Sequence, residues 1–133
     1  MNNPFAVDTN VLIYLEGNDV VKRRIAETLL SDNPVISSQV ISEFINVIRR
    51  LRKVPKHQLI TETSILFRHC LIASIDHSTL DLAKNLIEKY DFQIFDSIVV
   101  ASALESNCNI LYSEDMQHNL LVYKKLKIIN PFI

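Results

Sequence analysis

Short apolar runs alternate along the chain with longer segments in which apolar residues recur every three or four positions. Runs of the first kind are typical of buried strands, and the second pattern is typical of amphipathic helices. Strands are predicted at 5–7, 35–36, 70–73, 110–112 and 128–129. Helices are predicted at 9–15, 20–30, 38–51, 56–69, 78–90 and 98–104.

Local signals indicate where several of these elements begin or end. Pro55 ends the helix that starts at Ser38, because proline removes a backbone donor and clashes with the preceding turn. Ser78-Thr79-Leu80-Asp81 has the pattern of a capping box that opens the next long helix. Asp96 is expected to head segment 98–104, which is apolar almost all round and is therefore predicted to be a central, buried helix. Ile128-Ile129 is expected to form an edge strand.

The alternation of short strands with helices predicts a mainly parallel sheet covered by helices on both faces, the three-layer α/β/α class. The 133 residues contain no linker, repeat or low-complexity segment, so one domain over 1–133 is expected. No stretch reaches the roughly 18 apolar residues that a membrane helix needs. The first residues also lack the basic and apolar regions of an export signal, which predicts a cytoplasmic protein.

The composition excludes several classes of site. Gly17 is the single glycine, so a P-loop, a dinucleotide-binding fingerprint and an α/β-hydrolase nucleophile elbow are all absent. The two cysteines, Cys70 and Cys108, form no Cys-x-x-Cys pair, and the four histidines form no His-x-x-x-His pair. Sequence-local zinc motifs are therefore missing, and both cysteines are expected to be free core residues.

The net charge is −1, but the charges are unevenly distributed. Segments 44–61 and 116–133 contain basic residues and no acidic residue, so the rest of the chain is strongly acidic. This division suits a cation site beside a surface that binds a polyanion. The basic residues near a helix end also have a simpler explanation, since they complement the helix dipole. The candidate contacts are Arg49, Arg50, Arg52 and Lys53.

Four carboxylates fall where the carboxyl ends of the predicted strands meet the starts of helices, the edge at which such sheets bind ligands. Each has an ordinary structural explanation as a helix cap, a solvated charge or a turn former. Together they predict a cation site, because clustered carboxylates repel one another unless a cation neutralises them. Ligand sets made of oxygen suit Mg²⁺ or Mn²⁺. The four residues are Asp8, Glu43, Asp96 and Asp115.

A site of this kind typically acts on a phosphate ester. The cation activates a water molecule and neutralises charge that develops on the phosphorus, so the side chains need not be nucleophiles.

The order and spacing of these acids resemble the PIN-domain ribonucleases, in particular the VapC-like toxins of bacterial type II toxin-antitoxin pairs. The likeness extends over nearly the whole chain. Its matching segments are 5–13, 37–44, 95–104 and 110–116. The sequence departs from the family in its near absence of glycine, notably at Gln117-His118-Asn119, which puts the local loop shape in doubt.

The resemblance implies an endoribonuclease that uses Mg²⁺ or Mn²⁺ and is inhibited by an antitoxin covering its site. By this resemblance the four acids form the metal site, with Asp8 and Asp96 as the direct ligands. Asn10 and Ser113 match polar positions that support the site, although a helix cap and a strand-end hydroxyl explain them equally well. The high apolar content of so short a chain, 48%, further predicts a homodimer.

Two other functions remain open at this point. In a phosphatase of the haloacid dehalogenase kind Asp8 would be the nucleophile, but the acid expected two residues later is replaced by Asn10. A non-catalytic PIN-like binding module is the third possibility, against which the presence of all four acids counts.

Overall fold

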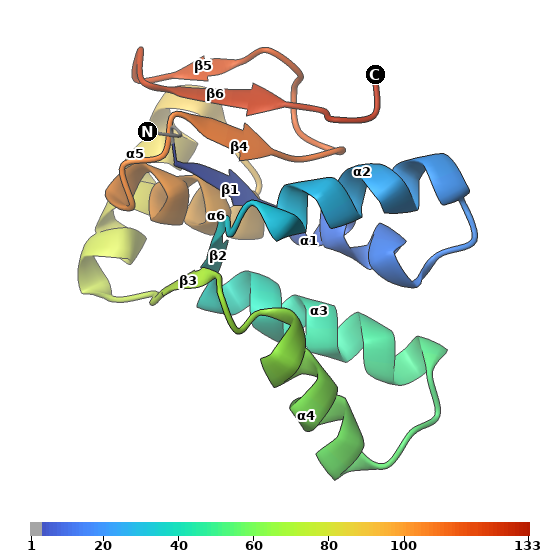
Figure 1. The fold of residues 1–133 in the computed structure, drawn as a ribbon. Coiled ribbons are helices and arrows are strands. Elements are labelled where there is room, and N and C mark those ends of the chain that lie inside the picture. The colour runs from blue at the N-terminus through green and yellow to red at the C-terminus, as the bar shows by residue number, and fades with distance from the viewer. Residues whose placement is uncertain (1–3) are drawn as a thin grey trace.

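A six-stranded sheet of short strands runs through the middle of the protein, as the computed structural model shows for residues 4–133 (Figure 1). The strand order is β3-β2-β1-β4-β6-β5, and all neighbouring pairs are parallel except β5 with β6. Residues 1–3, on which the expected absence of an export signal partly rests, lie outside the described residues. The strands are β1 Phe5–Val7, β2 Val35–Ser37, β3 Leu71–Ala73, β4 Ile110–Tyr112, β5 Leu121–Val122 and β6 Leu126–Ile129.

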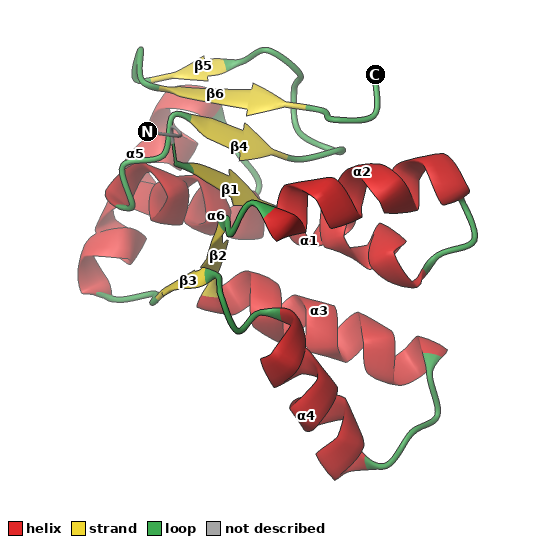
Figure 2. Cartoon of the chain, in the orientation of Figure 1, coloured by secondary structure: helices red, strands yellow, loops and turns green. Residues whose placement is uncertain are grey.

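Helices cover both faces of this sheet, with α5 and α6 behind it and α2 towards the viewer in Figure 2. The predicted three-layer α/β architecture is therefore confirmed, and most predicted boundaries are correct to within a few residues. The helices are α1 Thr9–Leu12, continued by the 3-10 turn η1 Ile13–Glu16, α2 Val20–Ser31, α3 Ser38–Leu51, α4 Lys56–Leu66, α5 His77–Tyr90 and α6 Ile94–Glu105.

The starts of two helices differ from the prediction. The capping box of α5 is formed by Asp76 and Thr79: Asp76 Oδ1 accepts from the Thr79 amide at 3.1 Å, and the Asp76 amide donates to Thr79 Oγ1 at 3.2 Å. The capping box predicted to start at Ser78 is therefore wrong. Helix α6 begins at Ile94 after Gln93 as N-cap, so Asp96 lies in the first turn and does not cap the helix.

The C-terminal strand is also placed differently from the prediction. Strand β6 lies between β4 and β5, so the sheet edges are β3 and β5 and the expectation of an edge strand at 128–129 is wrong. Strand β5 has two residues and is too short to show a period in sequence. A tight turn at Tyr123 and Lys124, both with positive φ, joins it to β6.

Helix α6 lies at the centre of the core, as its apolar sequence predicts. Val100 and Ala101 are fully buried, and the helix packs on α5 and against β2 and β4. Cys108 is buried and Cys70 is half-buried, and both thiols are free. Within residues 4–133 no helix is both long and apolar enough to span a bilayer.

The strand order changes direction between β1 and β4. From β1 the chain adds β2 and then β3 on one side, and it returns with β4 on the other side. Helices that connect parallel strands on opposite sides leave a crevice at such a point, beyond the carboxyl ends of the strands. The residues that follow β1 and β4 therefore lie together at the rim of this crevice.

Candidate active site

Asp8 occupies the centre of the site because it directly follows β1, which pairs with both β2 and β4. It is the N-cap of α1, where its Oδ1 accepts from the Thr9 amide at 2.8 Å. The residue is 6% exposed. Its other oxygen, Oδ2, accepts from Ser113 Oγ at 3.0 Å and from Asn10 Nδ2 at 3.5 Å. Asp8 is thus both a helix cap and a buried carboxylate held on two sides.

Asn10 and Ser113 lie beside Asp8, as the sequence indicated. The Asn10 amide nitrogen is 3.3 Å from Ser113 Oγ as well as near Asp8. The Asn10 Oδ1 accepts from the Glu114 backbone amide at 3.1 Å. Asn10 therefore ties the turn after β1 to the turn after β4, a contact between residues 104 positions apart.

The pKa of the Asp8 carboxyl is raised to about 6, mainly by burial and to a smaller extent by the negative charges of Asp96 and Glu43. The hydrogen bonds from Thr9 and Ser113 act in the opposite direction, because they favour the charged form. The balance leaves a carboxylate that is costly to ionise without a compensating positive charge. Such a group is a good candidate for binding a cation.

Asp96 and Glu43 act on Asp8 electrostatically, and Asp115 acts on Asp96. Asp96, in the first turn of α6, is partly buried, and its pKa is raised by burial and then by the charges of Asp115 and Glu43. Glu43 on α3 accepts from Gln39 Nε2 at 3.1 Å, whereas Asp115 is exposed. The four predicted residues therefore share one field of like charges.

These acids do not converge on one point. Among residues 4–133 no three histidine, cysteine, aspartate or glutamate side chains are close enough to hold a metal ion together. The donor chemistry nevertheless fits a hard divalent cation, since the site offers carboxylate oxygens and the Ser113 hydroxyl and, in the described part of the chain, no nitrogen or sulfur ligand set. Like-charged carboxylates approach one another only when a cation neutralises them.

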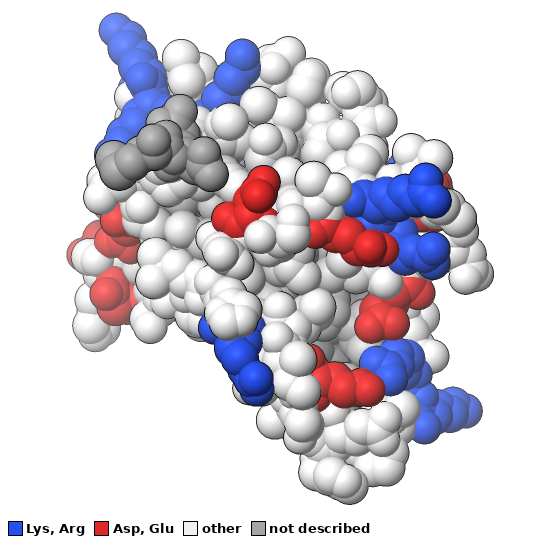
Figure 3. Space-filling view, in the orientation of Figure 1, with Lys and Arg blue, Asp and Glu red and all other residues white. Residues whose placement is uncertain are grey.

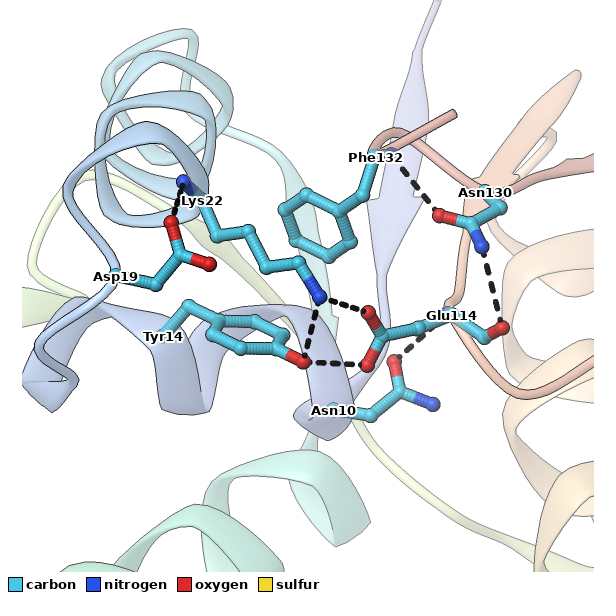
Figure 4. A network of polar contacts seen from close by, with 7 residues as sticks. All are labelled: Asn10, Tyr14, Asp19, Lys22, Glu114, Asn130 and Phe132. Atoms are coloured by element: carbon cyan, nitrogen blue, oxygen red, sulfur yellow. Dashed lines mark hydrogen bonds and ion pairs between the residues drawn. The ribbon is translucent and has the colours of Figure 1, made fainter.

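Glu114, which the sequence reasoning did not identify, has its carboxylate in a polar network with Tyr14 and Lys22 (Figure 4). Tyr14 Oη donates to Glu114 Oε1 at 2.7 Å, and Lys22 Nζ lies 3.1 Å from Oε2. The Lys22 ammonium also lies over the rings of Tyr14 and Phe132. These contacts join residues about a hundred positions apart, so no local sequence signal pointed to them.

The basic residues predicted to contact a polyanion fall into two groups. Arg52 forms ion pairs with Glu62 at 2.8 Å and Glu16 at 3.7 Å, which join the end of α3 to α4 and η1. Arg49, Arg50 and Lys53 are exposed. Acidic and basic side chains are interspersed around α2, α3 and α4, and further basic side chains gather where β5 meets β6 (Figure 3). Arg52 thus has a structural role in joining these elements, whereas Arg49, Arg50 and Lys53 are exposed.

Solved structures that are similar to this chain include the following three. The first is a toxin-antitoxin complex from Klebsiella pneumoniae, with a TM-score of 0.72, 20% identity and coverage of 97% of this chain and 98% of that chain. The second is VapC20 from Mycobacterium tuberculosis, described as a toxin that cleaves the sarcin-ricin loop, with a TM-score of 0.64, 16% identity and coverage of 84% and 89%. The third is VapBC2 from Rickettsia felis bound to a promoter DNA fragment, with a TM-score of 0.63, 16% identity and coverage of 93% and 96%.

At these identities the structural likeness establishes the fold. Comparison with curated protein sequences gives no significant match. The profile of the PIN domain matches residues 5–120, which include Asp8, Glu43, Asp96 and Asp115. The chain therefore belongs to the PIN domain family.

Proposed function

We propose that this protein is an endoribonuclease dependent on Mg²⁺ or Mn²⁺ and that it is the toxin of a bacterial toxin-antitoxin pair. The observation that carries the proposal is Asp8, a buried carboxylate with a raised pKa, held by Ser113 and flanked by the charges of Asp96 and Glu43. In this proposal residues 1–133 act as one PIN domain. Its substrate is RNA, which places its action in the cytoplasm.

Asp8 and Asp96 would hold the cation directly, with Glu43 and Asp115 completing the acidic site. The bound ion would supply the positive charge that lowers the pKa of an attacking water and neutralises the phosphate in the transition state. Ser113 and Asn10 hold Asp8 Oδ2 in one orientation, and the Thr9 amide holds Oδ1. The chain's own part is therefore to orient the Asp8 carboxylate and to keep it poorly solvated.

The phosphatase alternative is less well supported. It needs an acid-base group two residues after Asp8, and the Asn10 amide neither gains nor loses a proton in the range that such chemistry needs. Asn10 is instead engaged with Asp8, Ser113 and Glu114. A non-catalytic binding module would not need a buried carboxylate flanked by the charges of two others.

The toxin role is supported by the kind of proteins that share this fold, one of which is named as a toxin-antitoxin complex and another as a toxin. Exposed apolar side chains supply surface for an antitoxin and for a second copy of the chain. Examples are Leu51 at 62% and Ile60 at 56% exposure, near the junction of α3 and α4, and Leu71 at 61% on the edge strand β3.

The test is RNA cleavage by the purified protein in Mg²⁺ or Mn²⁺, in parallel with excess EDTA. We expect cleavage with either metal and none with the chelator. Undiminished cleavage in EDTA would contradict metal dependence, and a trapped phosphoryl group on Asp8 would favour the phosphatase. Co-expression with a neighbouring small gene should relieve growth inhibition, and a protein harmless to its host when expressed alone would contradict the toxin role.

A further inference from the structure

A cavity of about 460 Å³ adjoins the acidic site on the outer side of α3. It is lined by Gln39, Ser42, Glu43, Asn46 and Phe95. The four α3 residues are spaced i, i+3, i+4 and i+7, so they form one stripe along the helix. The cavity shares Glu43 with the acidic site, and Phe95 directly precedes Asp96. A ligand in this cavity would therefore lie next to the reacting phosphate.

Phe95 is unusually placed for an aromatic residue of a buried helix. Its side chain is 65% exposed, although it lies in the first turn of the central helix α6. It lines a second cavity of about 430 Å³ with Gln93, Ile94 and Asp96. Exposing so much aromatic surface costs free energy that burial would recover. The ring thus offers a flat apolar surface at the edge of the acidic site.

The polar groups around the ring are positioned by contacts that leave hydrogen-bonding capacity for a ligand. Gln39 Nε2 donates to Glu43 Oε1 at 3.1 Å and to the Phe95 carbonyl at 3.3 Å, which joins α3 to α6. Asn46 Oδ1 accepts from Arg49 Nε at 2.9 Å. Among residues 4–133, Gln39 Oε1 accepts no hydrogen bond and Asn46 Nδ2 donates no hydrogen bond. A hydrogen-bond acceptor on Gln39 and a donor on Asn46 therefore line the same cavity as the exposed Phe95 ring.

Arg49 extends this stripe away from the acids. Its contact with Asn46 places an exposed guanidinium at the far side of the cavity from Glu43. The carboxylate of Glu43, the amide of Asn46 and the guanidinium of Arg49 thus follow one another along α3. The aromatic ring of Phe95 lies alongside them. A nucleotide offers complementary groups, since its phosphate pairs with arginine, its base edge with amides and its base face with an aromatic ring.

We infer that Phe95, Gln39 and Asn46 form a pocket for one unpaired nucleobase of the RNA substrate, next to the phosphate that is cleaved. The base stacks on Phe95, its edge contacts the two amides, and Arg49 contacts an adjacent phosphate. Stacking on Phe95 requires a base that is not held in a base pair. This inference rests on the proposed ribonuclease function and adds to it the feature of the substrate that is recognised.

The test compares short single-stranded RNAs that are identical except for one abasic position, scanned through the oligonucleotide. Binding is measured by fluorescence anisotropy with the inactive Asp8→Asn protein in Mg²⁺. One abasic position should weaken binding roughly 5- to 100-fold, the range expected for losing one base–aromatic stack. When Phe95→Ala is added to Asp8→Asn, the abasic RNA and the intact RNA should bind equally well. When Phe95→Tyr is added instead, the abasic RNA should still bind more weakly than the intact RNA.

Leu80→Ala on α5 is the matched control, because Leu80 is exposed and lines neither cavity. It should retain the full abasic effect. If Phe95→Ala discriminates between the RNAs as well as its parent does, the inference fails while the nuclease proposal survives. If wild-type protein cleaves no RNA, the proposed function itself fails.

Two further measurements distinguish an RNA contact from a protein contact. Light scattering should give the same oligomeric state for wild type and Phe95→Ala, and both should bind the antitoxin equally well. A change of either kind with unchanged RNA binding would make Phe95 a protein-interface residue and would overturn the inference.

Discussion

The Ser113 hydroxyl donates to Asp8 Oδ2 at 3.0 Å, across 105 positions of sequence. The contact follows from the parallel register of β1 and β4, in which Val7 lies opposite Tyr112. The next residue of each strand is therefore brought to the same edge of the sheet. The orientation of the central carboxylate is thus set by strand pairing rather than by its own loop.

Replacing Ser113 by alanine should weaken the metal site without removing a ligand. The Asp8 carboxylate would lose a hydrogen bond that lowers its pKa, so its pKa should rise further. Metal affinity should fall about 10- to 100-fold, the usual effect of losing a residue that orients a metal ligand. Calorimetric titration with Mn²⁺ measures this change. Ser102→Ala is the control, because the Ser102 hydroxyl is buried in α6 without a partner among the described residues, and its loss should leave metal affinity unchanged.

Substituting Asp8 or Asp96 by asparagine should abolish RNA cleavage and leave the fold intact. The change is nearly isosteric and relieves repulsion among the four acids, so the metal-free variants should melt at the same temperature as wild type or higher. Cleavage assays at saturating Mg²⁺, together with thermal melts, test both parts. Near-full turnover in either variant would remove that residue from the set of metal ligands.

The stability of the metal-free protein should depend on the ionisation of Asp8. The pKa of this carboxyl is about 6 in the folded protein, against 3.8 for an unperturbed aspartate, so the folded state binds the proton more tightly. The contribution of Asp8 to stability is therefore fully present below pH 4 and is lost as the pH rises through 6. The difference in pKa corresponds to about 3 kcal/mol at most.

Urea unfolding of wild type and Asp8→Asn between pH 4 and 7 measures this contribution as a difference, because carboxylates that do not interact with Asp8 contribute equally to both proteins. The asparagine variant should gain stability relative to wild type as the pH rises. Parallel curves for the two proteins would mean that Asp8 ionises as easily as a solvated aspartate.

Charge reversal should separate the exposed arginines from Arg52. Arg49→Glu with Arg50→Glu should raise the KM for RNA and reduce its salt dependence, because phosphate contacts release counterions when they form. Metal affinity should be unchanged. Arg52→Glu should mainly destabilise the fold, because it would oppose Glu62 and Glu16 with a like charge. An unchanged salt dependence in the double variant would mean that Arg49 and Arg50 are simply solvated.

The sequence by itself determined the alternation of strands and helices, the burial of α6 and the order of the four acids. These properties are local, since they depend on the period of apolar residues and on residues that begin or end helices. The short hairpin strand β5 and the exact start of α5 escaped the same reasoning. Two residues show no period, and the Asp76–Thr79 box departs from the usual pattern, in which Glu or Gln stands at the third helical position.

The tertiary structure alone decided which of these residues meet. Strand order placed β4 beside β1, and with it Ser113 beside Asp8. The tertiary structure also brings Glu114 into an ion pair with Lys22 and Arg52 into an ion pair with Glu62. Contacts across a sheet or between helices depend on which faces pack together, and a one-dimensional pattern of polar and apolar residues carries no information about that choice. The sequence therefore identified the acids as candidates, and the packing decided how their charges act on one another.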